Sequence, residues 1–140
     1  MESETNGTLE PTAPRFRILV AEDNPSNYKL VEVLLRRDYE LMHAWDGAEA
    51  VELFRTQGAD LVLMDISMPV MDGYEALRQI RILSADIPVI ALTACAFEAD
   101  RQHIADAGFT ECMAKPLRVG ELRTRVASIL APLPNPQASK

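Results

Sequence analysis

The sequence predicts a doubly wound α/β domain, in which helices cover both faces of a parallel sheet. Three continuous apolar runs, at 18–21, 61–64 and 89–92, have the length and composition of strands buried on both faces. Helical patterns separate these runs, and such alternation favours right-handed crossovers between parallel strands. Two weaker runs, at 40–44 and 111–114, complete a set of five strands alternating with five helices.

Capping residues mark where the helices begin and end. Asn24 followed by Pro25 predicts the start of the first helix, because Asn accepts hydrogen bonds at an N-cap and Pro suits the first turn. Asp46 and Asp72 each stand three residues before a glutamate, as in a capping box. Gly108 predicts the end of the fourth helix. The fifth helix is predicted from an apolar stripe made of Val119, Leu122, Val126 and Ile129.

Length and composition indicate one globular domain, which we expect to span 15–131. The chain has 140 residues, of which 48% are hydrophobic and 25% charged. Residues 1–14 are acidic and polar and predict a disordered lead or linker, and the Pro-rich segment 132–140 predicts a disordered tail. The net charge of −7 argues against direct binding to nucleic acid or to an anionic membrane surface. Without a secretory signal or a long apolar run, the sequence predicts a cytoplasmic location and reduced cysteines.

Chemically complementary residues follow four of the five predicted strands. The residues at these ends are Glu22, Asp23, Asp65, Thr93 and Lys115. Because the carboxyl ends of parallel strands meet at the ligand crevice of an open sheet, we expect these side chains to converge.

The residue types predict phosphoryl chemistry supported by a divalent cation. Crowded carboxylates repel one another unless a cation lies among them, and oxygen ligands favour Mg²⁺ or the similar Mn²⁺. A hydroxyl group and an ammonium group suit an arriving phosphoryl group. A carboxylate can itself be the nucleophile. We expect that nucleophile to be Asp65, which stands alone at the end of the central apolar run.

Four motifs, in this order and spacing, resemble the signature of response-regulator receiver domains. They are Glu22-Asp23-Asn24, the segment 64–73 with sequence MDISMPVMDG, Leu92-Thr93-Ala94 and Lys115-Pro116-Leu117. The resemblance covers about 16–131 and implies a flavodoxin-like sheet in the order 2-1-3-4-5. It implies that Asp65 accepts a phosphoryl group from a phosphohistidine on a histidine kinase or a histidine phosphotransfer protein, in a two-component phosphorelay. The reaction would be self-catalysed, so the domain would not be a turnover enzyme by itself.

The same resemblance assigns the supporting residues. Asp23 and Asp65 would hold Mg²⁺ (or Mn²⁺) together with the backbone carbonyl of Ser67, and Glu22 would support the ion through water. Thr93 and Lys115 would contact the phosphoryl oxygens. The peptide bond before Pro116 is typically cis in this family, and a cis bond costs little before proline.

Cys112 departs from the family pattern. It stands three residues before Lys115, where many receivers carry an aromatic residue that turns inward with the threonine. We expect the fourth helix, fifth strand and fifth helix to form the protein-contact face, and with Cys112 in place of the aromatic this face would shift differently or less. Ser67 and Cys95 would line the path of the hydrolytic water, and neither would plainly orient it.

The sequence leaves the molecular context open between two settings. The domain could be a stand-alone regulator. It could also be the receiver segment of a hybrid histidine kinase, in which case it could belong to the cytoplasmic part of a membrane-bound kinase. The tract Glu22–Asn27, read with the threonine and lysine motifs, favours the kinase origin. The sequence also leaves open whether the domain forms a weak homodimer.

Other classes share parts of the pattern. A flavin-binding domain is disfavoured, because Glu22 and Asp23 would repel the flavin phosphate. A haloacid-dehalogenase-type phosphatase would need a second acid where this chain has Ser67. The remaining alternative is a receiver-like interaction module that acts without phosphorylation. We expect His43 and His103 to serve packing or surface roles, and Trp45 to cover the end of the second strand.

Overall fold

The computed structural model describes residues 15–94 and 98–132 of the chain. Five strands alternate with five helices in this part. The strands are β1 (Arg17–Ala21), β2 (Glu40–Ala44), β3 (Leu61–Asp65), β4 (Val89–Thr93) and β5 (Glu111–Ala114). The helices are α1 (Pro25–Leu35), α2 (Gly47–Gln57), α3 (Gly73–Leu83), α4 (Glu98–Ala107) and α5 (Val119–Leu130). The predicted elements are therefore all present within the described residues.

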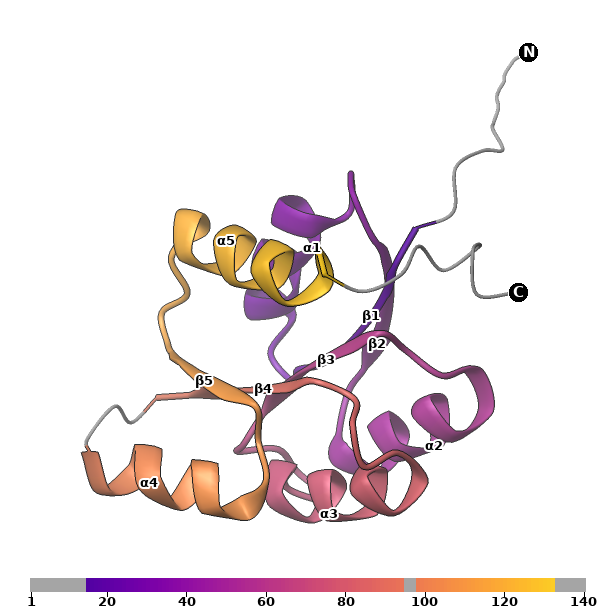
Figure 1. Ribbon diagram of the computed structural model, residues 1–140, viewed down its shortest axis with the longest axis vertical. Coiled ribbons are helices and arrows are strands. Elements are labelled where there is room, and N and C mark those ends of the chain that lie inside the picture. Colours follow the sequence, from indigo (N-terminus) through magenta and orange to yellow (C-terminus); the bar gives the residue numbers. More distant parts are fainter. Residues whose placement is uncertain (1–14, 95–97, 133–140) are drawn as a thin grey trace.

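All strands pair in parallel, in the order β2-β1-β3-β4-β5. The chain places β2 on one side of β1 and then returns to place β3 on the other side of β1, so β3 lies in the centre of the sheet. Helices α1 and α5 lie on one face, and α2, α3 and α4 lie on the other (Figure 1). The doubly wound topology expected from the sequence is confirmed, and the reversal point is where such folds bind ligands.

The core consists of two apolar layers separated by the sheet. Successive residues of β3 alternate between them: Leu61 and Leu63 pack toward α1 and α5, whereas Val62 and Met64 pack toward the other three helices. Every residue of β3 and β4 is buried. Burial on both faces explains why these strands read as continuous apolar runs rather than as an alternating pattern.

The predicted caps are present at three helix starts. The Asn24 side chain accepts hydrogen bonds from the backbone N–H groups of Ser26 and Asn27. Asp46 and Asp72 accept from the N–H groups of the glutamates three residues later. In α2 the return bond differs from a capping box, because Glu49 accepts from the N–H of Trp45, one residue before the cap. The N-caps therefore form as predicted, but the glutamates have other partners than a capping box gives them: Glu49 accepts from Trp45, and Glu75 accepts from Arg78 and Gln79.

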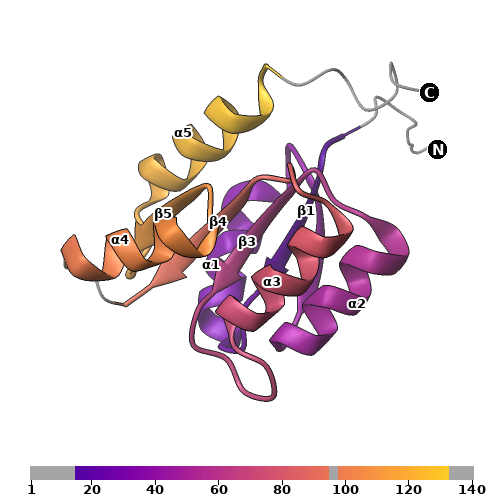
Figure 2. The ribbon, with the colours of Figure 1, turned by 60° about the horizontal axis from the view of Figure 1, so that its bottom comes forward.

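Gly108 follows α4 with φ of +112°, as expected of a glycine that ends a helix. Two strands extend one residue beyond the predicted apolar runs, so that Asp65 and Thr93 are the last residues of β3 and β4. The loop from β3 to α3 projects beyond the carboxyl edge of the sheet, at the bottom of Figure 2. The edge predicted to carry the site is thus formed by strand residues and the loops that directly follow them.

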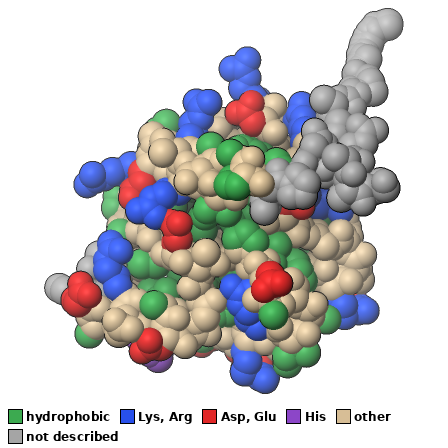
Figure 3. Space-filling model, in the orientation of Figure 1, with side chains coloured by type: hydrophobic (Ala, Val, Ile, Leu, Met, Phe, Trp, Pro, Cys, Tyr) green, Lys and Arg blue, Asp and Glu red, His purple; other side chains and the backbone are tan. Residues whose placement is uncertain are grey.

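The lead 1–14, most of the tail 132–140 and Cys95 lie outside the described residues. Within the described part, no helix has the length and apolar character needed to cross a bilayer. On the face drawn in Figure 3, acidic and basic side chains are interspersed. Among the described residues, some ion pairs form within one helix, such as that of Arg55 with Glu52 at 2.5 Å.

Candidate functional site

Backbone hydrogen bonds fasten the strand ends that carry the predicted site. The N–H of Glu22 donates to the carbonyl of Ala44 at 3.0 Å, just beyond the end of β1. The N–H of Ile66 donates to the carbonyl of Leu92 at 3.1 Å, and that of Lys115 to the carbonyl of Thr93 at 2.7 Å. Each ladder thus continues one residue past its strand, and the side chains start from an ordered edge.

Three carboxylates meet at this edge. One oxygen from each of Glu22, Asp23 and Asp65 lies within 4.8 Å of the others. Glu22 is 1% exposed and Asp65 is 5% exposed, whereas Asp23 faces solvent. Negative groups held this close repel one another, so the arrangement requires positive charge nearby.

Lys115 supplies part of that charge. Its Nζ lies 2.8 Å from Asp65 Oδ2 and 3.1 Å from Glu22 Oε1. The hydrogen bonds that Nζ donates go to Asp65 Oδ2 and, at 3.4 Å, to Glu22 Oε2. Glu22 Oε1 is buried and accepts no hydrogen bond from the residues described. A buried carboxylate oxygen that has an ion-pair contact but accepts no hydrogen bond, beside two other carboxylates, suits a bound cation.

The electrostatics of the site follow from burial and from these contacts. Burial raises the pKa of Glu22, and the negative charge of Asp65 raises it further, against the opposing effect of Lys115. For Lys115, burial lowers the pKa, but the hydrogen bonds to Asp65 and Glu22 outweigh it and raise the pKa overall. The ammonium group therefore keeps its charge at neutral pH, and a nearby cation would favour the charged form of Glu22.

The loop after β3 turns back onto Asp65. The N–H of Ser67 donates to Asp65 Oδ1 at 3.0 Å, so the two Asp65 oxygens have different partners. On the opposite side of the site, the peptide bond between Lys115 and Pro116 is cis.

Two glycines allow the helices to approach this loop closely. A Cβ on Gly73 would lie 2.6 Å from the Asp65 carbonyl oxygen, and a Cβ on Gly47 would lie 2.1 Å from the Met71 carbonyl oxygen. Both glycines also donate backbone hydrogen bonds to the loop, Gly73 to Ile66 at 2.8 Å and Gly47 to Met71 at 3.1 Å. Neither is among the site residues predicted from the sequence. The only signal was the Asp-Gly pair at each helix start, which by itself indicates a cap.

Thr93 is 9% exposed and ends β4, beside the strand that carries Asp65. Cys112 lies on β5, half-buried against the apolar layer under α2, α3 and α4. Its Sγ lies 3.6 Å from Arg101 Nη1 of α4. The structure therefore brings the predicted acids and Lys115 into contact, and it places Thr93 at the end of β4 and Cys112 on β5, the edge strand that leads to Lys115.

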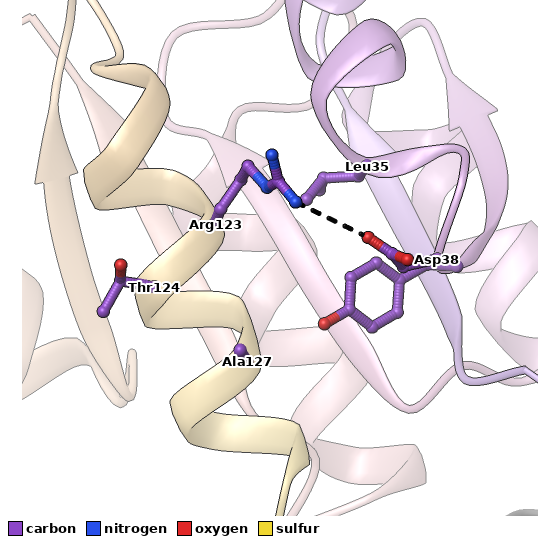
Figure 4. A pocket seen from close by; sticks show the side chains of 6 residues that line it. Leu35, Asp38, Arg123, Thr124 and Ala127 are labelled. Atoms are coloured by element: carbon purple, nitrogen blue, oxygen red, sulfur yellow. Dashed lines mark ion pairs between the residues drawn. The ribbon is translucent and has the colours of Figure 1, made fainter.

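A separate pocket of about 250 Å³ lies between the end of α1 and α5 (Figure 4). Arg123 reaches across it toward Asp38, at 3.9 Å. Its lining comprises Leu35, Asp38, Tyr39, Arg123, Thr124 and Ala127, none of which belongs to the acidic cluster. The chemistry predicted from the strand ends is therefore located at the carboxyl edge and not in this pocket.

Comparison with known proteins identifies the family. The family model described as the response regulator receiver domain matches residues 18–127, which is most of the described chain. The chain belongs to this family and is a receiver domain of two-component signalling systems. The acidic edge of the sheet described above lies within the matched region, and the alternative of an unrelated flavin-binding or phosphatase class is not supported.

Two similar proteins agree with this family assignment. The chain is 36% identical over 124 residues to "Two-component system protein A" of Emericella nidulans, covering 86% of this chain but 18% of that protein. The receiver domain of the sensor histidine kinase PA1611 of Pseudomonas aeruginosa, solved with a magnesium ion in its active-site cleft, is 38% identical. That comparison has a TM-score of 0.77 and covers 84% of this chain and 98% of the other.

A second solved structure contains a partner. It is the receiver domain of Ssk1 of Saccharomyces cerevisiae in complex with the histidine phosphotransfer protein Ypd1. It is 26% identical with a TM-score of 0.77, and the match covers 83% of this chain and 89% of that one.

Proposed function

We propose that Asp65 is the phosphoacceptor of this receiver domain. The observation that supports this most directly is the position of its carboxylate, which lies in the acidic cluster and 2.8 Å from the Lys115 ammonium group. An Asp65 oxygen forms a bond to phosphorus while the phosphorus–nitrogen bond of a phosphohistidine breaks, and the imidazole nitrogen keeps that electron pair. Lys115 neutralises charge on the phosphoryl oxygens, and the hydroxyl group of Thr93 donates a hydrogen bond to them.

The acidic cluster holds a divalent cation, which we take to be Mg²⁺ with Mn²⁺ as a substitute. Asp23, Asp65 and the backbone carbonyl of Ser67 are the direct ligands, and Glu22 acts through water. The support is the mutual approach of three carboxylates and the buried Glu22 oxygen without a hydrogen-bond donor. When bound, the ion neutralises charge that would otherwise oppose the approach of a phosphoryl group.

The phosphoryl donor is a histidine kinase or a histidine phosphotransfer protein, as in the Ypd1 complex of a related receiver. The reaction is self-catalysed, so the domain has no turnover of its own beyond gaining and losing the phosphoryl group. We place the domain in the cytoplasm as the receiver segment of a longer kinase. The domain makes no direct contact with nucleic acid or membrane in this function, and the function does not require a weak homodimer.

Phosphorylation changes the contact face formed by α4, β5 and α5. Because Cys112 stands where many receivers carry an aromatic residue, this change does not use that ring and is smaller or different in form; Cys112 Sγ on β5 lies 3.6 Å from Arg101 Nη1 of α4. Switching of this kind is a population shift between two packings of a loop and a helix.

The test is an intact mass spectrum after incubation with acetyl phosphate, with and without Mg²⁺. The wild type should gain one phosphoryl group only with Mg²⁺, and Asp65→Asn should gain none. Asp86→Asn is a matched control, because Asp86 is an exposed carboxylate at the opposite end of the sheet. Phosphorylation of the Asp65→Asn variant would contradict the proposal. So would a wild type that gains nothing from either acetyl phosphate or a phosphorylated histidine phosphotransfer protein.

A further inference from the structure

His43, on the second strand, contacts two aromatic rings. Its imidazole stacks on Tyr28 of α1, with ring centroids 3.6 Å apart and planes within 1° of each other. Trp45 lies against the imidazole, with centroids 4.1 Å apart and a tilt of 41°. Close contact with two rings restricts rotation of the imidazole about its own side-chain bonds. The ring nitrogens therefore have a defined direction.

One of those nitrogens contacts the acidic site. His43 Nε2 lies 2.8 Å from the backbone carbonyl oxygen of Glu22. A carbonyl oxygen only accepts hydrogen bonds, so Nε2 carries the proton and donates. The N–H of the same Glu22 donates to the Ala44 carbonyl at 3.0 Å. Both backbone groups of Glu22 are thus bound by neighbouring residues of β2.

This attachment matters because Glu22 stands just outside β1, which ends at Ala21. Its side chain is 1% exposed, and the next residue, Asp23, is exposed. The chain then enters α1 through the cap residue Asn24, whose N–H donates to Glu22 Oε2 at 3.2 Å. The two acidic side chains therefore start from a short connection between a strand and a helix. Repulsion among the carboxylates would displace such a connection unless other contacts hold it.

We propose that His43 is a positioning residue for the acidic cluster. Its Nε2–H holds the Glu22 carbonyl, and the rings of Tyr28 and Trp45 hold the imidazole. Together they keep the Glu22 and Asp23 carboxylates at the spacing that a divalent cation requires. The proposal rests on the proposed metal site, and it adds a residue that touches neither the cation nor the phosphoryl group. Partners one step removed from a metal commonly change its affinity about 10- to 100-fold.

The test separates the hydrogen bond from the packing. His43→Phe keeps a flat ring against Tyr28 and Trp45 but removes the donor, and His43→Gln keeps an N–H donor without the ring. His103→Phe is the matched control, because His103 is an exposed residue of α4 whose ring lies near Tyr74. Tyr28→Leu loosens the ring and keeps the donor, and it serves if His43→Phe does not fold. Mn²⁺ binding is followed by the electron paramagnetic resonance signal of free Mn²⁺.

We expect His43→Phe to weaken Mn²⁺ binding about tenfold, His43→Gln to stay within about threefold of the wild type, and His103→Phe to bind unchanged. In the metal-free protein, hydrogen exchange of the Glu22 amide should accelerate in His43→Phe and not in His43→Gln. Unchanged binding and exchange in both His43→Phe and Tyr28→Leu would overturn the proposal. Equal losses in His43→Phe and His43→Gln would also overturn it, because the donor would then be irrelevant. A wild type that binds no Mn²⁺ would instead contradict the metal site, and with it the role of His43 toward a cation.

Discussion

Leu63 and Asp65 lie two residues apart on β3, and both are buried, but they contribute to the protein in opposite ways. Leu63 is fully enclosed by apolar side chains of the layer under α1 and α5. Asp65 is enclosed by charges, with Lys115 on one oxygen and two further carboxylates close by. Burial of Leu63 stabilises the fold, whereas burial of Asp65 opposes it unless positive charge is present. The middle of the sheet is therefore built for stability and its carboxyl edge for chemistry.

The largest effect should come from shortening Leu63. Leu63→Ala removes a side chain that is 0% exposed, and we expect the free energy of unfolding to fall by about 3–5 kcal/mol. Urea denaturation at neutral pH measures this. The control is Leu83→Ala, because Leu83 ends α3 and is 46% exposed, so its loss should cost below about 1 kcal/mol. Equal losses in the two variants would contradict the comparison between core and surface.

A methyl group on Gly73 should disturb both the stability of the fold and the chemistry at the carboxyl edge of the sheet. The added Cβ would meet the carbonyl of Asp65 at 2.6 Å, so the backbone must shift. We expect Gly73→Ala to cost about 1–3 kcal/mol and to lower phosphorylation by acetyl phosphate as well. Gly120→Ala is the matched control, since Gly120 lies in α5 with open space around it. That variant should gain up to about 1 kcal/mol from helix propensity. Normal phosphorylation in a destabilised Gly73→Ala protein would show that the close approach does not position Asp65.

The charge of Glu22 should make the carboxyl edge sensitive to pH. Burial and the Asp65 charge raise the pKa of Glu22 above 4.5 in the metal-free protein. Its contribution to stability is then complete below pH 4.5 and is lost as the pH rises through the raised folded value. Glu22→Gln has no such ionisation, so its advantage in unfolding free energy over the wild type should grow as the pH rises above 4.5.

Thermal or urea unfolding from pH 4 to 8 measures this difference. Saturating Mg²⁺ should reverse the order, because a cation that binds the folded wild type more tightly stabilises it more. An advantage of Glu22→Gln that is constant with pH would mean that ionisation of Glu22 is not its source.

The smallest effect should come from Val70, in the loop beside the site. Val70 is 83% exposed and has φ of +68°, a left-handed conformation that costs a β-branched residue about 1–2 kcal/mol. Val70→Gly removes that strain and adds freedom to the unfolded chain, so we expect a net gain of about 0.5 kcal/mol. Val33→Gly, at an exposed position inside α1, should instead lose about 1 kcal/mol. A loss in both variants would mean that the loop stores no strain at Val70.

The fold could be predicted well because its signals are local. In the runs at 18–21, 61–64 and 89–92, the residues on both faces of each strand are apolar. A sheet covered by helices on both faces buries them all. The caps Asn24, Asp46 and Asp72 mark helix starts through hydrogen bonds within four residues. Such contacts depend little on the rest of the molecule, so the sequence pattern is sufficient to predict them.

The site could be predicted as a set of strand-end residues, since parallel strands bring their carboxyl ends to one edge. What the pattern could not supply were contacts that join separate segments of the chain. The pairing of Lys115 with Glu22 as well as Asp65 depends on side-chain directions across three strands. The approach of Gly73 to the Asp65 carbonyl depends on how closely α3 packs against the loop.

His43 illustrates the boundary between the two kinds of information. The sequence by itself determined its strand, because the run at 40–44 precedes a marked helix start. Only the tertiary structure decided its contacts, because the sheet register places it beside β1 and α1 supplies Tyr28. Local preferences follow from each residue and its near neighbours. The hydrogen bond from His43 to Glu22 and the stacking of Tyr28 on the same ring require two strands and a helix to meet, and their meeting is decided by the packing of the whole domain.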